Sequence, residues 1–178
     1  MKISIVVCTY NGMSYLKEQL DSLRLQIRKP DEVLISDDNS KDGTVEYVKS
    51  YINKYNLDNW LIRVNKPNLG WRKNFMKAIH DSIGDIVFTC DQDDIWDENK
   101  IKYMSEIMEN HSEINLLASN FYEWYSDNSL KEIKYSESEE MLIQVSLPIN
   151  LLNCPFPGCV QCIRKSFYNK YIQYWLDT

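Results

Sequence analysis

Two kinds of apolar spacing alternate along the first two thirds of the chain. Short runs rich in Ile, Val and Leu, each ending in polar turn residues, predict buried β-strands at 2–8, 32–36, 60–64 and 85–90. Between them, apolar residues recur every three or four positions and predict amphipathic helices over 16–27, 45–55, 71–83 and 100–111. Ser14 is the predicted N-cap of the first helix.

This alternation of strand and helix predicts an α/β fold, with a mainly parallel sheet and helices on both faces. After residue 112 the pattern weakens, and we expect the sheet to become mixed. The elements predicted there are a strand at 115–124, a turn at 126–129, a short strand at 160–164 and a closing helix at 167–176. No internal repeat or linker divides the chain, so we expect one domain over 1–178.

Composition narrows the functional classes. The 178 residues include 44% apolar and 26% charged side chains, as in ordinary globular domains. A net charge of −6 argues against a general nucleic-acid binder, which would usually present a basic stripe. No apolar run approaches the ~20 residues of a membrane span. Residues 1–8 lack the features of a signal peptide, so we expect a cytoplasmic protein.

Polar residues gather where three of the predicted strands end. These clusters are Thr9–Gly12, Asp37–Asp38 and Asp91–Asp94. In open α/β sheets, ligands bind beyond the carboxyl ends of the strands. We therefore expect the three clusters to converge on one edge of the sheet.

The acidic cluster from Asp91 to Asp94 is the most informative segment. Charges this dense repel one another and resist burial unless a cation binds them. Alternate residues of an extended chain point the same way, so Asp91 and Asp93 are predicted to face one divalent cation that carries a phosphorylated ligand. The alternative is a solvated acidic turn that caps the next helix.

The first cluster suits a nucleotide. Thr9, Tyr10, Asn11 and Gly12 offer backbone N–H groups near a helix start, a favourable place for a phosphate or a polar edge. The alternative is a tight turn. The chain has neither G-x-G-x-x-G nor G-x-x-x-x-G-K-[ST], which disfavours dinucleotide-dehydrogenase and P-loop sites.

Three further side chains suit the same kind of ligand. The Asp38 carboxylate is able to accept hydrogen bonds from the N–H groups of a base, or it has a turn or cap role for the following helix. Arg72 and Lys73 begin the third predicted helix, where either suits a diphosphate, or both are solvated cations.

The five cysteines fall into two groups. Cys8 and Cys90 lie in apolar predicted strands and suit buried thiols. Cys154, Cys159 and Cys162 have the C-x4-C-x2-C spacing of one kind of iron–sulfur site, but no fourth cysteine follows them. We therefore expect small apolar side chains near a loop rather than a metal cluster.

Three segments, in this order and spacing, resemble the family 2 glycosyltransferases, whose fold is called GT-A. They are 7–12 (Val-Cys-Thr-Tyr-Asn-Gly), 35–44 (Ile-Ser-Asp-Asp-Asn-Ser-Lys-Asp-Gly-Thr) and 91–96 (Asp-Gln-Asp-Asp-Ile-Trp). The last segment, with Asn-Leu-Gly at 68–70 and Asn-Phe at 74–75, is most similar to the rhamnosyltransferase branch. The resemblance implies a nucleotide-sugar-binding half at 1–111 and an acceptor-side part at 112–178, which we expect to be incomplete.

The resemblance also implies roles for matching residues of the nucleotide site. Thr9 and Tyr10 would contact the donor nucleotide, and Asp38 would hydrogen-bond its pyrimidine base. The family often has Arg where this chain has Lys73, with Arg72 beside it. Which of the two cations faces the phosphates stays open.

The family resemblance also implies that the acidic segment binds the metal ion. Asp91 would lie near the ribose or the metal, and Asp93 would be the main ligand of Mg²⁺ or Mn²⁺ on the diphosphate. Asp94 would contact the sugar, or it would contact the metal ligands without binding the ion itself.

The implied reaction is an inverting transfer of a sugar to an acceptor hydroxyl. The metal would stabilise the leaving diphosphate, and a carboxylate base would take the proton of the acceptor. Family members usually carry this base in a His-Asp or Glu-Asp pair, and neither pair follows His111. Asp177 is the candidate base within the chain, but we expect instead that the chain stops before the base.

The resemblance implies a nucleoside-diphosphate sugar as donor and a glycan or lipid-linked acceptor of the cell surface. Such an acceptor would place the protein in peripheral contact with the inner face of the plasma membrane. Two alternatives remain: a catalytically incomplete nucleotide-sugar-binding module, and a metal-dependent phosphohydrolase or nucleotidyltransferase. An aspartyl phosphohydrolase would usually place D-x-D-x-T after its first strand, whereas this cluster follows the fourth.

Overall fold

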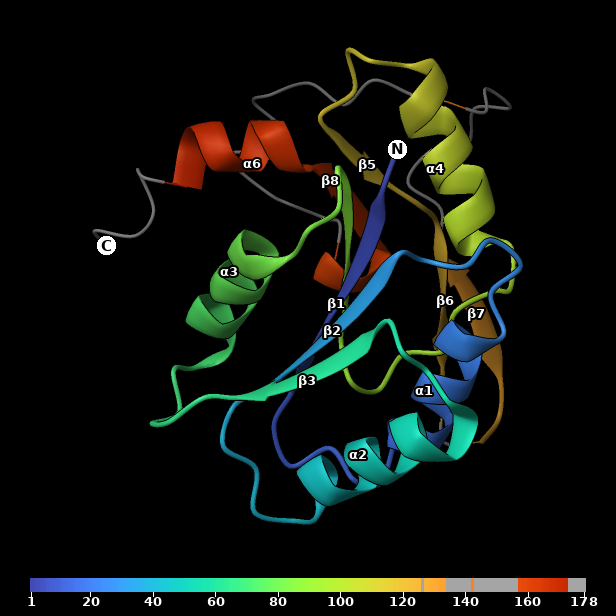
Figure 1. Ribbon diagram of the computed structural model, residues 1–178. Coiled ribbons are helices and arrows are strands. Elements are labelled where there is room, and N and C mark those ends of the chain that lie inside the picture. The colour runs from blue at the N-terminus through green and yellow to red at the C-terminus, as the bar shows by residue number, and fades with distance from the viewer. Residues whose placement is uncertain (126, 134–141, 143–156, 173–178) are drawn as a thin grey trace.

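A six-stranded sheet in the order β3-β2-β1-β4-β8-β5 forms the centre of the molecule (Figure 1). The computed structural model describes residues 1–125, 127–133, 142 and 157–172. The parallel strands are β1 (Ile3–Thr9), β2 (Glu32–Asp37), β3 (Trp60–Val64) and β4 (Ile86–Cys90). Strand β8 (Gln161–Arg164) runs antiparallel to both β4 and β5 (Leu116–Ala118). The predicted mainly parallel sheet, mixed at its C-terminal part, is confirmed.

The continuous apolar runs of the sequence correspond to strands that are covered on both faces. All residues of β1 and β2 are buried, so both faces of these strands contact the core. Strand β3 lies at the edge of the sheet, and its Leu61 and Val64 are exposed. The central position of β1 therefore explains why its sequence is apolar rather than alternating.

Helices cover both faces of the sheet (Figure 1). On one face lie α1 (Leu16–Arg24), α2 (Thr44–Tyr55) and α4 (Lys100–Asn110), and on the other lie α3 (Trp71–Asp81) and α6 (Lys165–Tyr171). The chain runs outward from β1 through β2 to β3 and then crosses back to β4, on the other side of β1. Right-handed crossovers in opposite directions place their helices on opposite faces, which explains the position of α3. The carboxyl ends of β1 and β4 therefore border a topological switch point, where ligands of such sheets bind.

Two consecutive cations at the junction of β8 and α6 hold the ends of two helices. Arg164 donates from Nη2 to the carbonyl of Met108, in the last turn of α4 (2.8 Å). Lys165 donates from Nζ to the carbonyls of His80 (2.8 Å) and Ser82 (2.9 Å), at the end of α3. Cations near a helix C-terminus satisfy its last carbonyls and interact favourably with its dipole. This junction therefore fixes helices from both faces against the sheet.

The start and end of α1 differ from the prediction. The N-cap is Tyr15 rather than Ser14, and it makes no side-chain capping hydrogen bond. The helix ends at Arg24, and Ile27, predicted on its apolar face, is 53% exposed. The amide N–H of Ile27 donates to the carbonyl of Glu98 (2.9 Å), so the chain has already left the helix there.

The predicted strand at 115–124 is two separate strands. Strand β5 joins the main sheet, whereas β6 (Phe121–Trp124) pairs with β7 (Leu130–Ile133) in a hairpin of its own. The hairpin turns at Asn128, which has a φ of 64° and donates from its amide to the carbonyl of Tyr125. The closing helix begins earlier than predicted, at Lys165, and the predicted positions after 172 lie outside the described residues.

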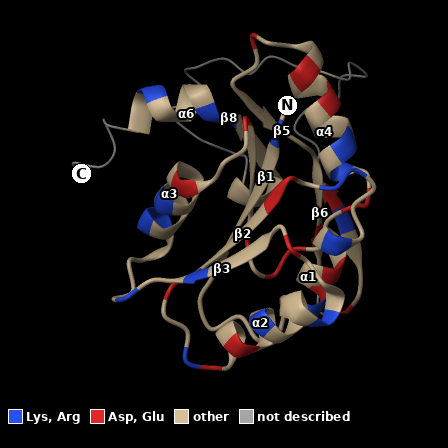
Figure 2. Ribbon diagram, viewed as in Figure 1, with Lys and Arg blue, Asp and Glu red and all other residues tan. Residues whose placement is uncertain are grey.

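Charge is distributed unevenly over the helices (Figure 2). Lys and Arg outnumber acidic residues on α3 and α6, whereas α4 carries both signs. The net charge of −6 therefore does not describe every face of the molecule. Among the described helices, none is long and apolar enough to cross a membrane.

Candidate functional site

The carboxyl ends of β1, β2 and β4 bring the three predicted polar clusters into contact. The amide N–H of Asp38 donates to the carbonyl of Thr9 (2.8 Å), and Thr9 Oγ1 donates to Asp37 Oδ2 (2.9 Å). The amide N–H of Tyr10 donates to Gln92 Oε1 (2.8 Å). The predicted convergence on one edge is therefore confirmed, and it lies at the topological switch point.

Gln92 is a residue that sequence reasoning did not single out. Its side-chain amide accepts from the N–H of Tyr10 and donates from Nε2 to the Tyr10 carbonyl (3.3 Å). A Cβ atom on Gly12 would lie 2.2 Å from Gln92 Oε1, so this bridge requires the glycine. In the sequence, only its position inside the acidic cluster could have indicated that Gln92 belongs to the site. Gln92 thus ties the loop after β4 to the loop after β1.

The backbone amides of the first loop are not open to a ligand, which corrects the prediction. The N–H groups of Tyr10, Asn11, Gly12 and Met13 donate to the side chains of Gln92, Ser40, Thr44 and Asp42, at 2.8–3.0 Å. The neighbouring loops satisfy these donors, so a nucleotide would meet side chains and carbonyls here instead. The ring of Tyr10, which is 52% exposed, is one such side chain. Its contact with a donor stays a prediction.

Asp38 is buried and already bound by the segment that precedes α3. Its Oδ1 accepts from the amide N–H of Leu69 (2.8 Å) and from Asn65 Nδ2 (3.1 Å). Its Oδ2 accepts from the amide N–H of Gly70 (2.8 Å), the N-cap residue of α3. Asp38 therefore has a structural role, as in the alternative, although it holds the segment that leads into α3 rather than the start of the next helix. A base would have to share the carboxylate with three internal donors, and that contact stays a prediction.

Arg72 and Lys73 are exposed in the first turn of α3. The guanidinium of Arg72 lies over the ring of Trp71, 5.1 Å from its centroid. Because α3 follows the carboxyl end of β3, both cations lie at the edge of the sheet that carries the polar clusters. Within the described residues, no hydrogen bond or ion pair ties either cation to the acidic cluster. Their contact with a diphosphate stays a prediction.

The acidic cluster forms a turn, which corrects the extended geometry assumed for Asp91 and Asp93. Strand β4 ends at Cys90, and the amide N–H of Asp91 then donates to Asp94 Oδ2 (3.3 Å). One oxygen of Asp91, one oxygen of Asp94 and the Sγ of Cys159 all lie within 4.8 Å of one another. Asp93 is exposed and does not belong to this group. The turn therefore pairs Asp91 with Asp94.

Burial and like charge act together on these two carboxylates. Burial, with the charges of Asp94 and Asp93, raises the pKa of Asp91 to about 6. Burial also raises the pKa of Asp94, although a hydrogen bond from Cys159 and the charge of Lys100 oppose that rise. Two partly buried carboxylates that repel each other favour a bound cation, and hard oxygens suit Mg²⁺ or Mn²⁺. Asp91 and Asp94 therefore fit a divalent ion.

The remaining predicted residues differ in what the structure shows. The candidate base Asp177 and Cys154 lie outside the described residues. Cys162 is buried in β8, as expected of a small apolar side chain. Cys159, expected to be the same, instead lies beside the acidic turn. Spacing along the chain does not indicate this difference, because it depends on how η1 (Gly158–Val160) packs near β4.

A model of glycosyl transferase family 2 matches residues 4–170. The chain belongs to glycosyltransferase family 2. This family 2 chain is 33% identical over 120 residues to the poly(ribitol-phosphate) beta-N-acetylglucosaminyltransferase TarS of Staphylococcus aureus, covering 66% of this chain and 21% of TarS. It is 29% identical over 163 residues to the dTDP-rhamnosyl transferase RfbG of Shigella flexneri, covering 89% of this chain and 54% of RfbG. The family 2 chain thus spans between 21% and 54% of the length of these relatives.

Solved structures share the fold of this family 2 chain. Residues 1–349 of S. aureus TarS in complex with UDP-GlcNAc match with a TM-score of 0.77 at 25% identity, covering 96% of this chain and 47% of the other. The mannosyltransferase PcManGT of Pyrobaculum calidifontis, in complex with GDP-Man and Mn²⁺, matches with a TM-score of 0.70 over 95% of this chain and 46% of the other. At 16% identity, that second match supports the fold alone. The family and the GT-A fold expected from the sequence are confirmed.

Proposed function

We propose that this chain is the donor-binding part of an inverting, metal-dependent glycosyltransferase. It would move a sugar from a nucleoside diphosphate to a glycan or lipid-linked acceptor. The observation that carries the proposal is the contact of three loops around the Asp91–Asp94 turn, at the switch point of a family 2 fold. A partly buried acidic turn, at the same edge of the sheet as exposed aromatic and basic side chains, suits a diphosphate that arrives with a cation.

Different side chains of the site would bind the metal, the nucleotide and the phosphates of the donor. Asp91 and Asp94 would hold Mg²⁺ or Mn²⁺, which, when bound, supplies Lewis-acid stabilisation to the leaving diphosphate. Asp93, which is exposed and next to Asp94 in the chain, is the metal ligand that the D-x-D motif suggests. The exposed ring of Tyr10 would contact the nucleotide, and the side chain of Arg72 or Lys73 would bind the phosphates.

The identity of the sugar rests on relatives that differ from one another. L-rhamnose is the sugar we propose, because RfbG is named a dTDP-rhamnosyl transferase and matches 89% of this chain. The TarS structure contains UDP-GlcNAc, so an N-acetylhexosamine carried by UDP is the alternative. Transfer to an acceptor would occur at the cytoplasmic face of the membrane, with Asp177 as the candidate base within the chain.

Calorimetric titration of UDP, dTDP and GDP, with and without Mn²⁺ or Mg²⁺, tests this proposal. We expect one nucleotide to bind only with metal, and Asp94→Asn to weaken that binding by at least roughly 10-fold, because even the loss of an outer-shell partner of a metal ligand typically costs about 10–100-fold. Asp58→Asn is the matched control, because Asp58 is exposed before β3 at the opposite edge of the sheet.

Two results would contradict the proposal: no nucleotide binds with either metal, or Asp94→Asn binds as tightly as the unmodified chain. Binding without sugar transfer would favour the nucleotide-sugar-binding module. Metal-dependent release of inorganic phosphate would favour the phosphohydrolase.

A further inference from the structure

The Cys159 thiol lies beside the two paired carboxylates of the acidic turn. Its Sγ lies within 4.8 Å of an oxygen of Asp91 and of Asp94. Bonds from such ligands to one divalent ion are roughly 2.0–2.3 Å long, so small side-chain rotations bring atoms at this spacing onto a single ion. The three residues come from two distant parts of the chain and meet because β8 returns beside β4.

Contacts from both layers of the fold hold Cys159 at this position. It lies in η1, immediately before β8. On one side, Thr89 Oγ1 of β4 donates to the carbonyl of Gly158. On the other, Lys100 Nζ of α4 donates to the carbonyl of Cys159 (2.7 Å). The thiol is therefore placed beside the carboxylates by the sheet and by a helix.

The environment of Cys159 differs from that of the other described cysteines. Cys8, Cys90 and Cys162 are buried in strands, within the two apolar clusters of the core. Cys159 is partly exposed, as are both carboxylates beside it, whereas the other three described cysteines are buried. Sulfur is a soft ligand, which Zn²⁺ and Cd²⁺ accept readily and Mg²⁺ does not.

We propose that Cys159 completes a mixed Asp91–Asp94–Cys159 cation site that favours thiophilic divalent ions over Mg²⁺. This inference rests on the proposed function, because it concerns the same cation site. Two carboxylates alone would leave the choice of ion to charge and size. A thiolate, formed when the thiol releases its proton to solvent as the ion binds, adds a preference for soft ions.

Titration of the full 178-residue chain with Cd²⁺, followed by ultraviolet absorption, tests the inference. A cadmium–thiolate bond gives a charge-transfer band that carboxylates do not give. Cys159→Ser keeps a hydrogen-bond donor for Asp94 but removes the sulfur. We therefore expect this variant to lose the band and roughly 10–100-fold of its Cd²⁺ affinity, while its Mg²⁺ affinity changes little. Cys162→Ala, at the next cysteine along the chain, is the matched control and should keep both.

Two outcomes overturn the inference: a band of equal strength in Cys159→Ser, or a ratio of Cd²⁺ to Mg²⁺ affinity that the substitution leaves unchanged. A merely structural hydrogen bond from Cys159 would give the second result. Metal-dependent nucleotide binding without a cadmium–thiolate band would overturn this inference and leave the proposed function standing. A band without any nucleotide binding would do the reverse.

A second measurement needs no substitution and covers the case in which Cys159→Ser fails to fold. Cd²⁺ should protect Cys159 of the unmodified chain from alkylation by iodoacetamide, whereas the same concentration of Mg²⁺ should not. Mass spectrometry of the peptide that contains Cys159 reads the extent of alkylation. Equal alkylation with the two ions would overturn the inference.

Discussion

The side-chain amide of Gln92 spans the gap between the carboxyl ends of β1 and β4. It accepts from and donates to the backbone of Tyr10, so the loop that carries the acidic turn is tied to the loop that would contact a nucleotide. Gly12 leaves the space that this amide occupies. The geometry of the site at this point therefore depends on one missing Cβ atom.

Gly12→Ala should weaken donor binding through Gln92. The new Cβ would displace the Gln92 amide and break its two hydrogen bonds to Tyr10, which we expect to cost about 1 kcal/mol, or roughly fivefold in affinity. Gln92→Ala should have a similar effect. Calorimetry of metal-dependent nucleotide binding measures both.

The double variant Gly12→Ala/Gln92→Ala is the control for this mechanism. If the alanine acts by displacing Gln92, the double variant binds no more weakly than either single variant, because the same interaction is lost in all three. Losses that add fully would show that Gly12 acts by another route.

Among the individual residues, the positions of the polar clusters were predicted correctly, but several of the contacts between their members were not. The end of a predicted strand locates Asp91 and Asp94 without any tertiary information. The hydrogen bond from Gly70 to Asp38 and the approach of Cys159 to the acidic turn join residues far apart in the chain. Such pairs depend on how loops pack, which a local pattern does not contain.

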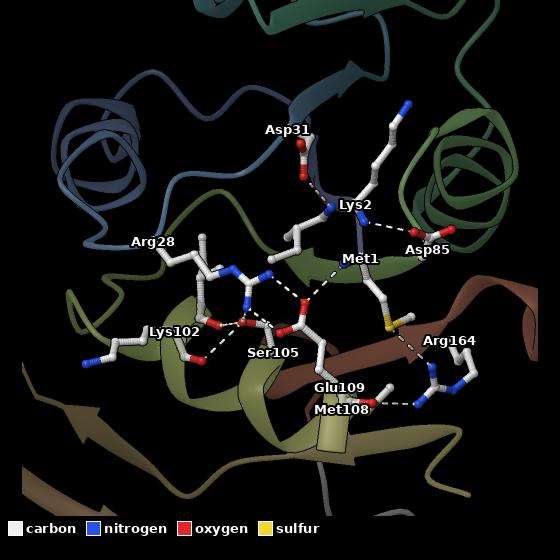
Figure 3. Close-up of polar contacts among 12 residues, drawn as sticks. Met1, Lys2, Arg28, Asp31, Asp85, Lys102, Ser105, Met108, Glu109 and Arg164 are labelled. Carbon is white, nitrogen blue, oxygen red and sulfur yellow. Dashed lines mark hydrogen bonds and ion pairs between the residues drawn. The ribbon is translucent and has the colours of Figure 1, made fainter. Parts of the chain in front are cut away.

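Arg28, in the connection after α1, binds the last turn of α4 (Figure 3). Its guanidinium donates from Nη2 to Glu109 Oε1 (2.7 Å) and from Nη1 to Glu109 Oε2 (2.9 Å), which is a bidentate ion pair. Nη1 also donates to Ser105 Oγ (2.7 Å). The N-terminal amine of Met1 donates to the same carboxylate (3.2 Å). One carboxylate therefore links α4, the segment after α1 and the N-terminus, just before β1.

This pair should make the stability of the fold depend on pH in the acid range. Hydrogen bonds from Arg28 lower the pKa of Glu109 to about 2. A carboxylate with a lowered pKa stabilises the folded state above its unfolded pKa of about 4.3, and that contribution is lost as pH falls toward about 2. The Glu109 and Arg28 side chains are 29% and 28% exposed, so solvent screens the pair and we expect a contribution of roughly 1 kcal/mol.

Urea unfolding of the unmodified chain and of Glu109→Gln at about pH 5 and about pH 2 measures this contribution. The two proteins should differ in unfolding free energy at the higher pH and converge at the lower one. Glu106→Gln, at an exposed position of the same helix, is the matched control. A difference between Glu109→Gln and the unmodified chain that stays constant with pH would rule out the ion pair as its cause.

At the element scale, prediction succeeded where one element has one periodicity. Strand β3 has the predicted bounds, because its apolar run is flanked by polar turn residues on both sides. The segment 115–124 failed because its apolar pattern continues through β5 and β6, which belong to different sheets. The pattern indicates that a residue is extended, but it does not indicate which strand it pairs with.

At the scale of the whole molecule, the alternation of strands and helices was enough to predict the class of fold. The order of the strands was not predicted, because the return of the chain from β3 to β4, beside β1, depends on the direction of one crossover. That single reversal creates the switch point and places α3 on the opposite face from α1 and α2. The location of the site is therefore a property of the topology, whereas its chemistry is already visible in the sequence.

We propose that a metal-bound nucleotide occupies the carboxyl edge between β1 and β4. Mn²⁺ is paramagnetic and broadens the NMR signals of nearby amides, so a titration of Mn²⁺ in the presence of UDP locates the ion directly. We expect the amide signals of Tyr10, Gln92 and Cys159 to disappear first, while those of Asn56–Asn59, at the opposite edge, remain. Broadening centred on that opposite edge, or the same broadening at Tyr10, Gln92 and Cys159 in Asp94→Asn, would contradict it.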